Sequence, residues 1–300
     1  MAQATALRND IWFARVRGSR AYRRFVKNKA AVASVFFLIF IALMGAFAEL
    51  VAPFSFETQN IDRVLEPPSG AHFFGTDSLG RDLFSRIIYG ARMSMSVGIL
   101  TAIVSVIIGG IYGAISGWVG GWIDTLMMRA IDILDAIPSL VLLILVGIVF
   151  TSYQPFENPE LRALTGILFA LSVVGWVSLA RLVRGQVLQA RELLFVEGAI
   201  AMGAKPSRIL LRHIAPNILG PVVVMLTFQI PSNILFESFL SFVGLGLQPP
   251  FSSWGVLAND GWRAKSSPHL IIFPGVALFL TMLAFNLFGD GLRDALDPKS

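Results

Sequence analysis

The organisation of the chain follows from residues 192–217, Glu192-Leu-Leu-Phe-Val-Glu197-Gly198-Ala199-Ile-Ala-Met-Gly203-Ala-Lys205-Pro206-Ser-Arg208-Ile-Leu-Leu-Arg212-His213-Ile-Ala-Pro216-Asn217. This stretch lies between two long apolar segments and predicts two short helices. The first covers residues 192–202, and acidic residues at its start complement the helix dipole. Gly203 is expected to break the helix because glycine adopts positive φ without strain. Pro206 suits the first turn of the second helix, which Pro216 is expected to end. Such a mixed apolar and basic helix–turn–helix is typical of a surface that another protein binds.

The composition is that of a polytopic membrane protein. Of the 300 residues, 55% are hydrophobic and 14% are charged, and the mean hydropathy is +0.70. Soluble domains carry roughly 25% charged residues. We therefore expect six apolar membrane spans, at residues 30–52, 93–118, 122–150, 164–183, 218–247 and 270–288.

The amino-terminal arm is strongly basic. Residues 1–29 contain eight Lys or Arg and one acid, Asp10. Aromatic and basic residues alternate over residues 8–28, which predicts an amphipathic helix at the membrane interface. A basic arm directly before an apolar span indicates retention in the cytoplasm rather than nucleic-acid binding. The apolar run that follows is too long for a signal peptide.

Residues 53–92 form a polar segment rich in proline and glycine. Within it, Asp77, Arg81, Asp82 and Arg86 place opposed charges a few residues apart. These charges can neutralise one another in a folded loop, and the glycines allow tight turns. The pattern predicts an ordered extramembrane loop and not an active site.

The second predicted span has one smooth face. Gly109, Gly113 and Gly117 recur every four residues along it. Small residues at this spacing let the backbones of two helices approach closely. The pattern therefore predicts tight packing against another span.

The third predicted span carries four charged residues, Asp124, Arg129, Asp132 and Asp135. Charges within an apolar stretch are costly unless they face protein or water. A proton relay is one use of these acids, and local ion pairing with Arg129 is the other. The spacing along the segment favours local pairing.

The fifth predicted span contains an acid, Glu237, with Ser238 and Ser241 close by and two prolines in the same segment. Two interpretations stay open. In the first, the helix lines a water-accessible cavity, and the three residues are candidates for a translocation path. In the second, Glu237 is a single buried structural acid, hydrogen-bonded or protonated.

A motif in the central stretch resembles that of a known family. Glu197-Gly198-Ala199, then Gly203, then Ile214-Ala215-Pro216 is similar to the Glu-Ala-Ala, Gly, hydrophobic-x-Pro pattern of ABC importer permeases. In that family this cytoplasmic loop forms coupling helices that dock into a groove of the ATPase subunit. Gly198 departs from the pattern by replacing the middle alanine with another small residue. The resemblance implies ATPase docking by Glu197, Gly198, Ala199, Gly203, Ala204, Arg208 and Pro216.

Three further runs resemble the C-type permease of peptide importers. Two of them are Phe236–Gly246 and Gly289–Pro298. The resemblance implies an all-α membrane protein with the six transmembrane helices of the type I ABC importer permease fold. It also implies a second, B-type permease, two ATP-binding subunits that hold ATP and Mg, and an extracytoplasmic peptide-binding protein. The third run is extracytoplasmic and contains Gly75, Thr76, Asp77, Gly80, Arg81, Asp82 and Arg86.

The distribution of basic residues predicts the orientation. The amino-terminal arm and residues 181–212 carry fourteen Lys or Arg, whereas the three opposite loops carry seven. The positive-inside rule places both termini in the cytoplasm, and the family resemblance makes the membrane a bacterial inner membrane. The expected division is an arm at 1–29, a first helix at 30–52, an extracytoplasmic segment at 53–92, a permease domain at 93–291 with the coupling loop 192–217, and a tail at 292–300.

The sequence contains no motif for nucleotide hydrolysis or other catalysis. It lacks a Gly-x-x-x-x-Gly-Lys-Ser/Thr run and other enzymatic constellations, so we expect no catalytic residue and no cofactor. Cysteine is absent and the three histidines are far apart, so no metal site is expected.

The favoured function is a permease subunit that moves oligopeptides or dipeptides, with nickel chelates and glutathione open as substrates. Its expected surroundings are partner proteins and membrane lipid, not nucleic acid. The alternative is a proton-coupled secondary transporter that uses Asp132, Asp135 or Glu237.

Overall fold

The computed structural model describes residues 20–153, 157, 159–247 and 251–297. Within these ranges the chain is helical and has no strand, apart from an isolated bridge between Thr76 and Asp82. The predicted all-α fold is confirmed. Most of the amphipathic helix predicted over residues 8–28 lies outside the described residues. The helices are α2 (Arg20–Lys27), α3 (Lys29–Ala46), α4 (Ala48–Val51), η1 (Ile61–Arg63), α5 (Leu83–Val119), α6 (Gly121–Asp135), α7 (Ser139–Tyr153), α8 (Pro159–Arg191), α9 (Leu194–Ala201), α10 (Pro206–Ile209), η2 (Leu210–Ile214), α11 (Ala215–Phe242), α12 (Trp254–Arg263) and α13 (His269–Leu296).

Five helical stretches are long and apolar enough to cross a membrane, namely α3, α5, most of α8, the continuous run Pro206–Phe242, and α13. A sixth candidate is α6 together with α7 up to Phe150, although the chain bends by 85° between them. Counting this bent pair as one span gives the predicted six. The break precedes Pro138, where the proline ring disfavours helical geometry in the preceding residue.

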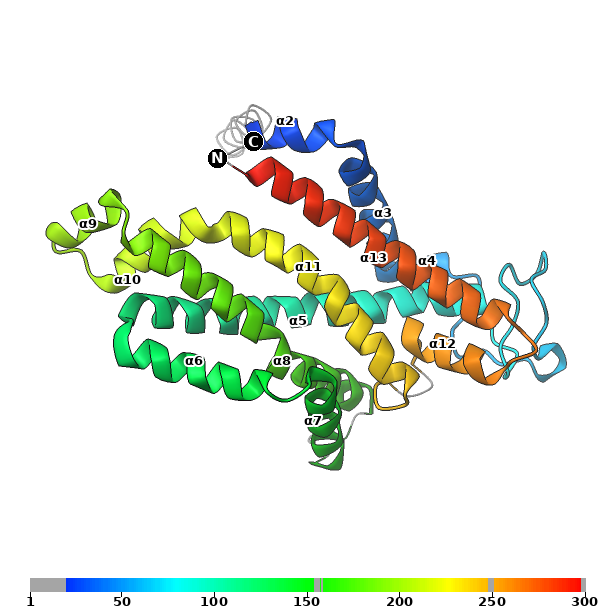
Figure 1. Cartoon of the computed structure of the whole chain (residues 1–300). Helices are drawn as coiled ribbons and strands as arrows, with labels where there is room; N and C mark the ends of the chain where they lie inside the picture. Colours follow the sequence, from blue (N-terminus) through cyan, green and yellow to red (C-terminus); the bar gives the residue numbers. More distant parts are fainter. Residues whose placement is uncertain (1–19, 154–156, 158, 248–250, 298–300) are drawn as a thin grey trace, which may run out of the picture.

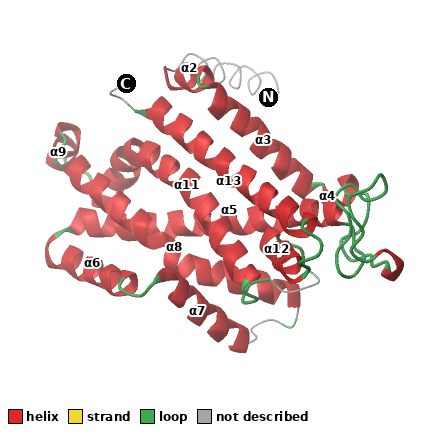
Figure 2. Cartoon of the chain, turned by 45° about the vertical axis from the view of Figure 1, so that its right-hand side comes forward, coloured by secondary structure: helices red, strands yellow, loops and turns green. Residues whose placement is uncertain are grey.

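The two ends of the helical bundle differ (Figure 1). α9 and α10 project at one end, while α12 and the loops before α5 gather at the opposite end. α5 extends between these two ends. A view turned by 45° shows the same loops clustered beside α4 and α12 (Figure 2). α7 packs chiefly on α8.

The second span begins earlier than predicted, at Leu83 rather than at residue 93. Its start is set by Asp82, whose side chain accepts a hydrogen bond from the backbone N–H of Ser85. An aspartate in this position satisfies one of the free N–H groups of the first helical turn. The last part of the predicted extracytoplasmic segment 53–92 is therefore helix.

Pro216 does not end a helix, contrary to the prediction. The chain continues from α10 through the π-helical turn η2 into α11, and Pro216 lies in the first turn of α11. A proline in an ordinary α-turn would meet the carbonyl group four residues earlier. The wider π turn directly before Pro216 relieves this conflict, so one helical rod joins α10 to α11.

Two other predicted boundaries also move. The segment between the predicted spans 218–247 and 270–288 contains α12, which Ser253 caps by accepting a hydrogen bond from the N–H of Val256. The last span continues to Leu296, so much of the predicted tail is helical.

The glycine face of α5 packs against α8, as predicted. A Cβ atom at Gly109 would lie 2.6 Å from the carbonyl oxygen of Trp176, and one at Gly113 would lie 2.3 Å from that of Ala180. A Cβ atom at Gly117 would lie 2.8 Å from the carbonyl oxygen of Arg184. The two backbones therefore approach too closely for any larger residue.

Replacing Gly113 by Ala should destabilise the fold, because the new methyl group meets backbone that cannot move aside. We expect a loss of about 1–3 kcal/mol, measured as a lower midpoint of thermal unfolding in detergent. Gly110→Ala is the matched control, since a Cβ at Gly110 meets nothing within 4 Å. Equal midpoints for the two variants would contradict close packing of α5 on α8.

Candidate functional site

The first candidate site is a helical knob, residues 194–214, at one end of the bundle (Figure 1). Its apolar side is buried against α8 and α11, and the residues involved include Val196, Ile209 and Ile214, which are at most 1% exposed. The knob is therefore a packed unit and not a loose loop.

Gly203 determines the turn inside the knob. Its φ is +74°, and the N–H of Ala204 donates to the carbonyl of Ala199 while that of Gly203 donates to Ile200. This is a Schellman motif, which requires a residue in the left-handed region just after the helix. Gly203 thus ends α9 as predicted, and the helix runs from Leu194 to Ala201 rather than over 192–202.

The predicted docking residues divide into two groups. Glu197, Gly198, Gly203, Arg208 and Pro216 are exposed, whereas Ala199 is buried and Ala204 is half-buried. Ala199 and Ala204 therefore support the turn from within. The most exposed apolar residues of the knob were not singled out from the sequence, although apolar residues that stand among charged ones were a usable signal. These residues are Leu194 (84% exposed), Met202 (84%) and Leu211 (75%).

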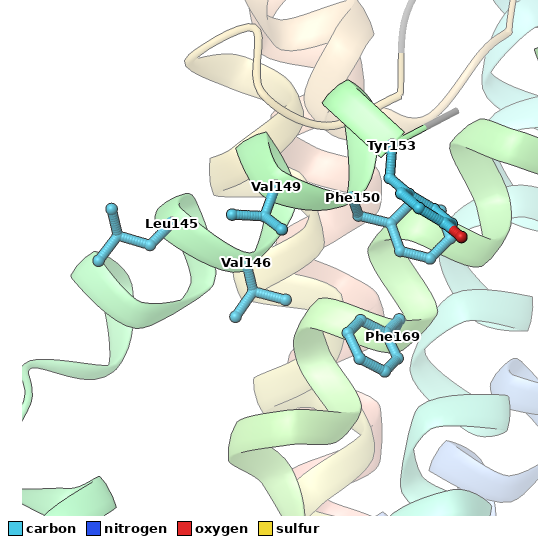
Figure 3. A pocket seen from close by; sticks show the side chains of 6 residues that line it. All are labelled: Leu145, Val146, Val149, Phe150, Tyr153 and Phe169. Atoms are coloured by element: carbon cyan, nitrogen blue, oxygen red, sulfur yellow. The ribbon is translucent and has the colours of Figure 1, made fainter. Parts of the chain in front are cut away.

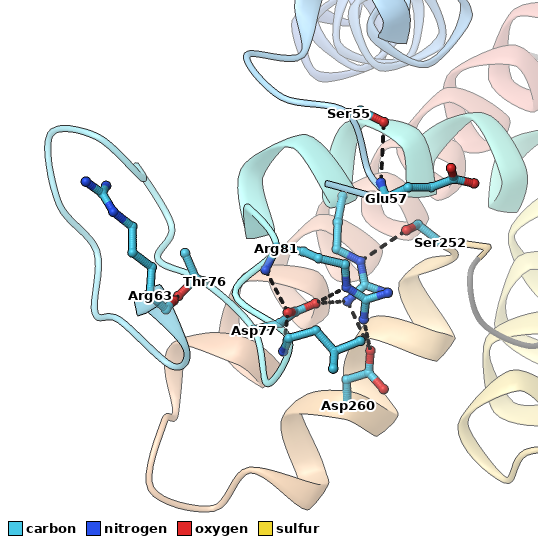
Figure 4. A network of polar contacts seen from close by, with 10 residues as sticks. Ser55, Glu57, Arg63, Thr76, Asp77, Arg81, Ser252 and Asp260 are labelled. Carbon is cyan, nitrogen blue, oxygen red and sulfur yellow. Dashed lines mark hydrogen bonds and ion pairs between the residues drawn. The ribbon is translucent and has the colours of Figure 1, made fainter. Parts of the chain in front are cut away.

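The second candidate site is an ion-pair cluster at the opposite end (Figure 4). The Arg81 Nε donates to Asp77 Oδ2 at 2.7 Å, and Arg86 also donates to Asp77. Asp260 of α12 joins the cluster, with its Oδ2 3.1 Å from Arg86 Nη1. Asp77, Arg81 and Arg86 are at most 4% exposed. The predicted neutralisation of Asp77 by the two arginines is confirmed, but the contribution of Asp260 was not foreseen.

The remaining residues of the predicted external motif shape the loop. Asp82 lies 2.8 Å from His72 Nδ1 and caps α5, so it does not pair with the arginines. Thr76 donates to the carbonyl of Arg63 and accepts from the N–H of Glu66. Gly75 and Gly80 both have positive φ, +80° and +70°. The motif is therefore an ordered loop, as predicted.

The acids of α6 pair with arginines of α8. Arg184 binds Asp124 through two hydrogen bonds of 2.5 and 2.6 Å, and Arg181 contacts Asp135 at 2.5 Å and Asp132 at 3.2 Å. The predicted local pairing with Arg129 is wrong. That residue is exposed on another face of α6, about 140° around the helix from Asp124.

Glu237 is buried, with none of its surface exposed. Its carboxylate accepts hydrogen bonds from Ser94 at 3.0 Å, Ser241 at 2.8 Å and Ser238 at 3.4 Å. Within this chain the geometry matches the second interpretation, a buried and hydrogen-bonded acid. The role of Glu237, Ser238 and Ser241 in a translocation path stays a prediction.

An apolar cavity of about 310 Å³ lies between α7 and α8 (Figure 3). Its walls offer almost no polar group for orienting a substrate, which suits lipid or the side chains of a neighbouring helix. The lining residues are Leu145, Val146, Val149, Phe150, Tyr153 and Phe169.

The fold is that of a membrane transport permease. The chain superposes on a chain from inward-facing conformations of the MetNI methionine ABC transporter with a TM-score of 0.52, covering 69% of this chain and 96% of that chain. The sequence identity is 14%, so this likeness concerns the fold alone.

The sequence matches identify the family. The family described as binding-protein-dependent transport system inner membrane component matches residues 107–300, and the N-terminal TM domain of oligopeptide transport permease C matches residues 17–68. The chain belongs to this family of inner membrane components and is a multi-pass permease subunit of an ABC transporter. The comparisons support this function and not the proton-coupled alternative.

Its relatives are similar over most of their length. The dipeptide transport system permease protein DppC of Bacillus subtilis (strain 168) is 45% identical, over 93% of this chain and 85% of the relative. The oligopeptide transport system permease protein OppC of Escherichia coli (strain K12) is 46% identical, over 93% and 90%. The glutathione transport system permease protein GsiD of Shigella flexneri serotype 5b (strain 8401) is 42% identical, over 93% and 89%.

Replacing Asp77 by Asn should destabilise the end of the bundle opposite to the knob. It removes the carboxylate that both buried arginines share. Asp260 then remains as the carboxylate that both buried arginines must share. Breaking a buried ion pair costs about 3–5 kcal/mol, so the thermal unfolding midpoint should fall clearly. In the exposed control, Asp62→Asn, the change should stay within about 0.5 kcal/mol. A midpoint unchanged by Asp77→Asn would show that the cluster contributes little.

Proposed function

We propose that this chain carries peptides across a bacterial inner membrane, driven by ATPase subunits that bind its helical knob. The observation that carries the proposal is the exposure of Leu194, Met202 and Leu211 on a knob whose other side is firmly packed. Highly exposed apolar side chains on a firmly packed unit at the edge of the bundle are typical of a protein interface. Glu197 and Arg208 lie exposed on the same knob, and Pro216 is exposed directly after it in the first turn of α11; all three belong to the proposed contact.

The proposed assembly contains four further proteins. Two ATP-binding subunits hold ATP and Mg, so this chain supplies neither a catalytic group nor a cofactor. A second, B-type permease completes the transmembrane path, and an extracytoplasmic peptide-binding protein delivers the substrate. The external motif from Gly75 to Arg86 lies at the end of the bundle opposite to the knob, where that delivery would occur (Figure 1).

The proposed orientation places the knob and both termini in the cytoplasm. The excess of Lys and Arg in the amino-terminal arm and near the knob supports it. The ion-pair cluster of Asp77, Arg86 and Asp260 then belongs to the extracytoplasmic face.

The proposed mechanism transmits force through a continuous helix. Closure of the ATPase subunits displaces the knob, and the run Pro206–Phe242 carries this displacement through the membrane. ATP favours one of two arrangements of the paired permeases because the closed ATPases bind that arrangement more tightly. The shared cavity, with Glu237, Ser238 and Ser241 as candidate path residues, then changes its access from outside to inside.

The substrate class is proposed from the relatives, which are named for dipeptides, oligopeptides and glutathione. The test is competition in proteoliposomes that contain the whole importer with its binding protein. Unlabelled peptides of increasing length are added against a labelled one. Competition by peptides supports the proposal, whereas uptake of a nickel chelate without any effect of peptides would reject it.

Leu194→Asp should weaken binding of the ATPase subunits without unfolding the permease, because the side chain is 84% exposed. Loss of a hot-spot contact costs at least about 2 kcal/mol, which is about 30-fold in affinity, so we expect a clear loss of ATPase subunit from the purified permease. Ile61→Asp is the matched control, an equally exposed residue (85%) at the opposite end of the molecule. Equal recovery of ATPase subunits with both variants would reject docking on the knob.

Two further variants test the same interface by uptake. Glu197→Lys reverses an exposed charge, and Gly203→Trp places a bulky residue at a backbone with φ of +74°. Both should abolish peptide uptake while the protein remains in the membrane. Normal uptake by Gly203→Trp would count against the docking role.

A further inference from the structure

The carboxylate of Glu237 lies where three elements meet. Ser238 and Ser241 belong to its own helix, α11, whereas Ser94 belongs to α5. Ser253, the capping residue of α12, contributes a further hydroxyl. All of these residues are at most 4% exposed. Within this chain the carboxylate is therefore enclosed by hydroxyl groups from several elements, and it joins those elements.

Glu237 is the common acceptor of the hydrogen bonds that these serine hydroxyls donate. Ser94 Oγ accepts the backbone N–H of Trp254 at 3.3 Å, and Ser241 Oγ accepts that of Leu247 at 3.2 Å. Each serine has a single O–H donor, which is then directed to the carboxylate. Two serines thus link the first residue of α12 and the loop that follows α11 to one acid. No other acidic residue in the described part of the chain is fully buried among hydroxyls in this way.

A second set of contacts fastens α12 to the same region. The amide of Asn259 donates to the carbonyl of Phe242, the last residue of α11. A Cβ atom at Gly255 would lie 2.3 Å from the carbonyl oxygen of Ser238, so α12 and α11 touch through their backbones. Further along α12, Asp260 binds Arg86 of α5. Arg86 and Ser94 are about two helical turns apart on α5.

We propose that Glu237 is a positioning residue that makes the outer ends of α5, α11 and α12 one rigid body. α11 is continuous with the knob, so a displacement of the knob reaches this body and, through α12 and Asp260, the external motif. Without the carboxylate, the outer end of α11 would move independently of α5 and α12. The inference deepens the proposed function, on which its transport measurement rests.

Distance measurements test the rigid body directly. The chain has no cysteine, so spin labels can be placed at introduced cysteines in the assembled importer with cysteine-free partners. Phe239 on α11, Leu100 on α5 and Arg263 on α12 are exposed positions for these labels. With Glu237 present, the distributions of the distances from position 239 to positions 100 and 263 should be narrow, and their means should be the same with and without a non-hydrolysable ATP analogue. Glu237→Ala should broaden at least one of them.

Transport measurements test whether loss of the rigid body lowers the ratio of peptide uptake to ATP hydrolysis. In proteoliposomes, Glu237→Ala should lower peptide uptake per ATP hydrolysed by about tenfold, within the range seen for residues that modulate coupling. Ser94→Ala should lower the same ratio, because it removes the link to α5 and Trp254. Glu237→Gln should lie between wild type and Glu237→Ala, since its amide oxygen still accepts a hydroxyl. Ser232→Ala is the control, an exposed serine of α11 that bonds only to its own helix.

The outcomes separate the two proposals. Absence of peptide uptake by the wild-type importer would reject the proposed function. Two results would reject the rigid body without affecting the proposed function. One is a mean distance between the labels that changes with nucleotide in the wild type, and the other is a set of distance distributions that stay narrow in Glu237→Ala. An unchanged ratio of uptake to ATP hydrolysis in both Glu237→Ala and Ser94→Ala would also reject it. Should Glu237→Ala fail to assemble, Ser94→Ala and Glu237→Gln decide the question by the same measurements.

Discussion

The structure depends on one constraint of the membrane interior, which is that polar groups there must be satisfied by protein. Each buried acid of the spanning region meets this constraint with partners from another helix. Asp124 binds Arg184 of α8, and Glu237 accepts a hydroxyl from Ser94 of α5. At the end opposite to the knob, Asp77 and Asp260 share Arg86. The same contacts that remove the cost of burial therefore also determine which helices lie together.

The knob, in contrast, exposes apolar side chains. Its inner side buries Val196 and Ile214, yet it leaves Leu194 and Met202 almost fully exposed beyond the spanning helices. Exposed apolar side chains on the other side of the knob add nothing to the stability of the isolated chain. In the proposed assembly the ATPase subunits cover this surface, in agreement with membership of a family of ABC transporter permeases.

The two ends of the molecule are connected by the shape of α11. The π turn at Leu210–Ile214 lets the chain pass Pro216 without a break, so the second half of the knob and the carboxyl-terminal end of α11 belong to one continuous helix. In contrast, the bend of 85° between α6 and α7 interrupts another candidate span. The structure thus combines one span that is helical throughout with one that is broken.

The sequence by itself determined the features that depend on a residue and its near neighbours. Apolar runs indicated the spans, Gly203 the turn of the knob, and Gly109, Gly113 and Gly117 the close helix contact. The motif runs indicated the family, which the comparisons confirm. Only the tertiary structure decided which partner each charge finds. Arg184 rather than Arg129 binds Asp124, and Asp260 joins Arg86 from a position 174 residues away. The local pattern does not contain such partners, because burial and neighbouring helices come from folding of the whole chain.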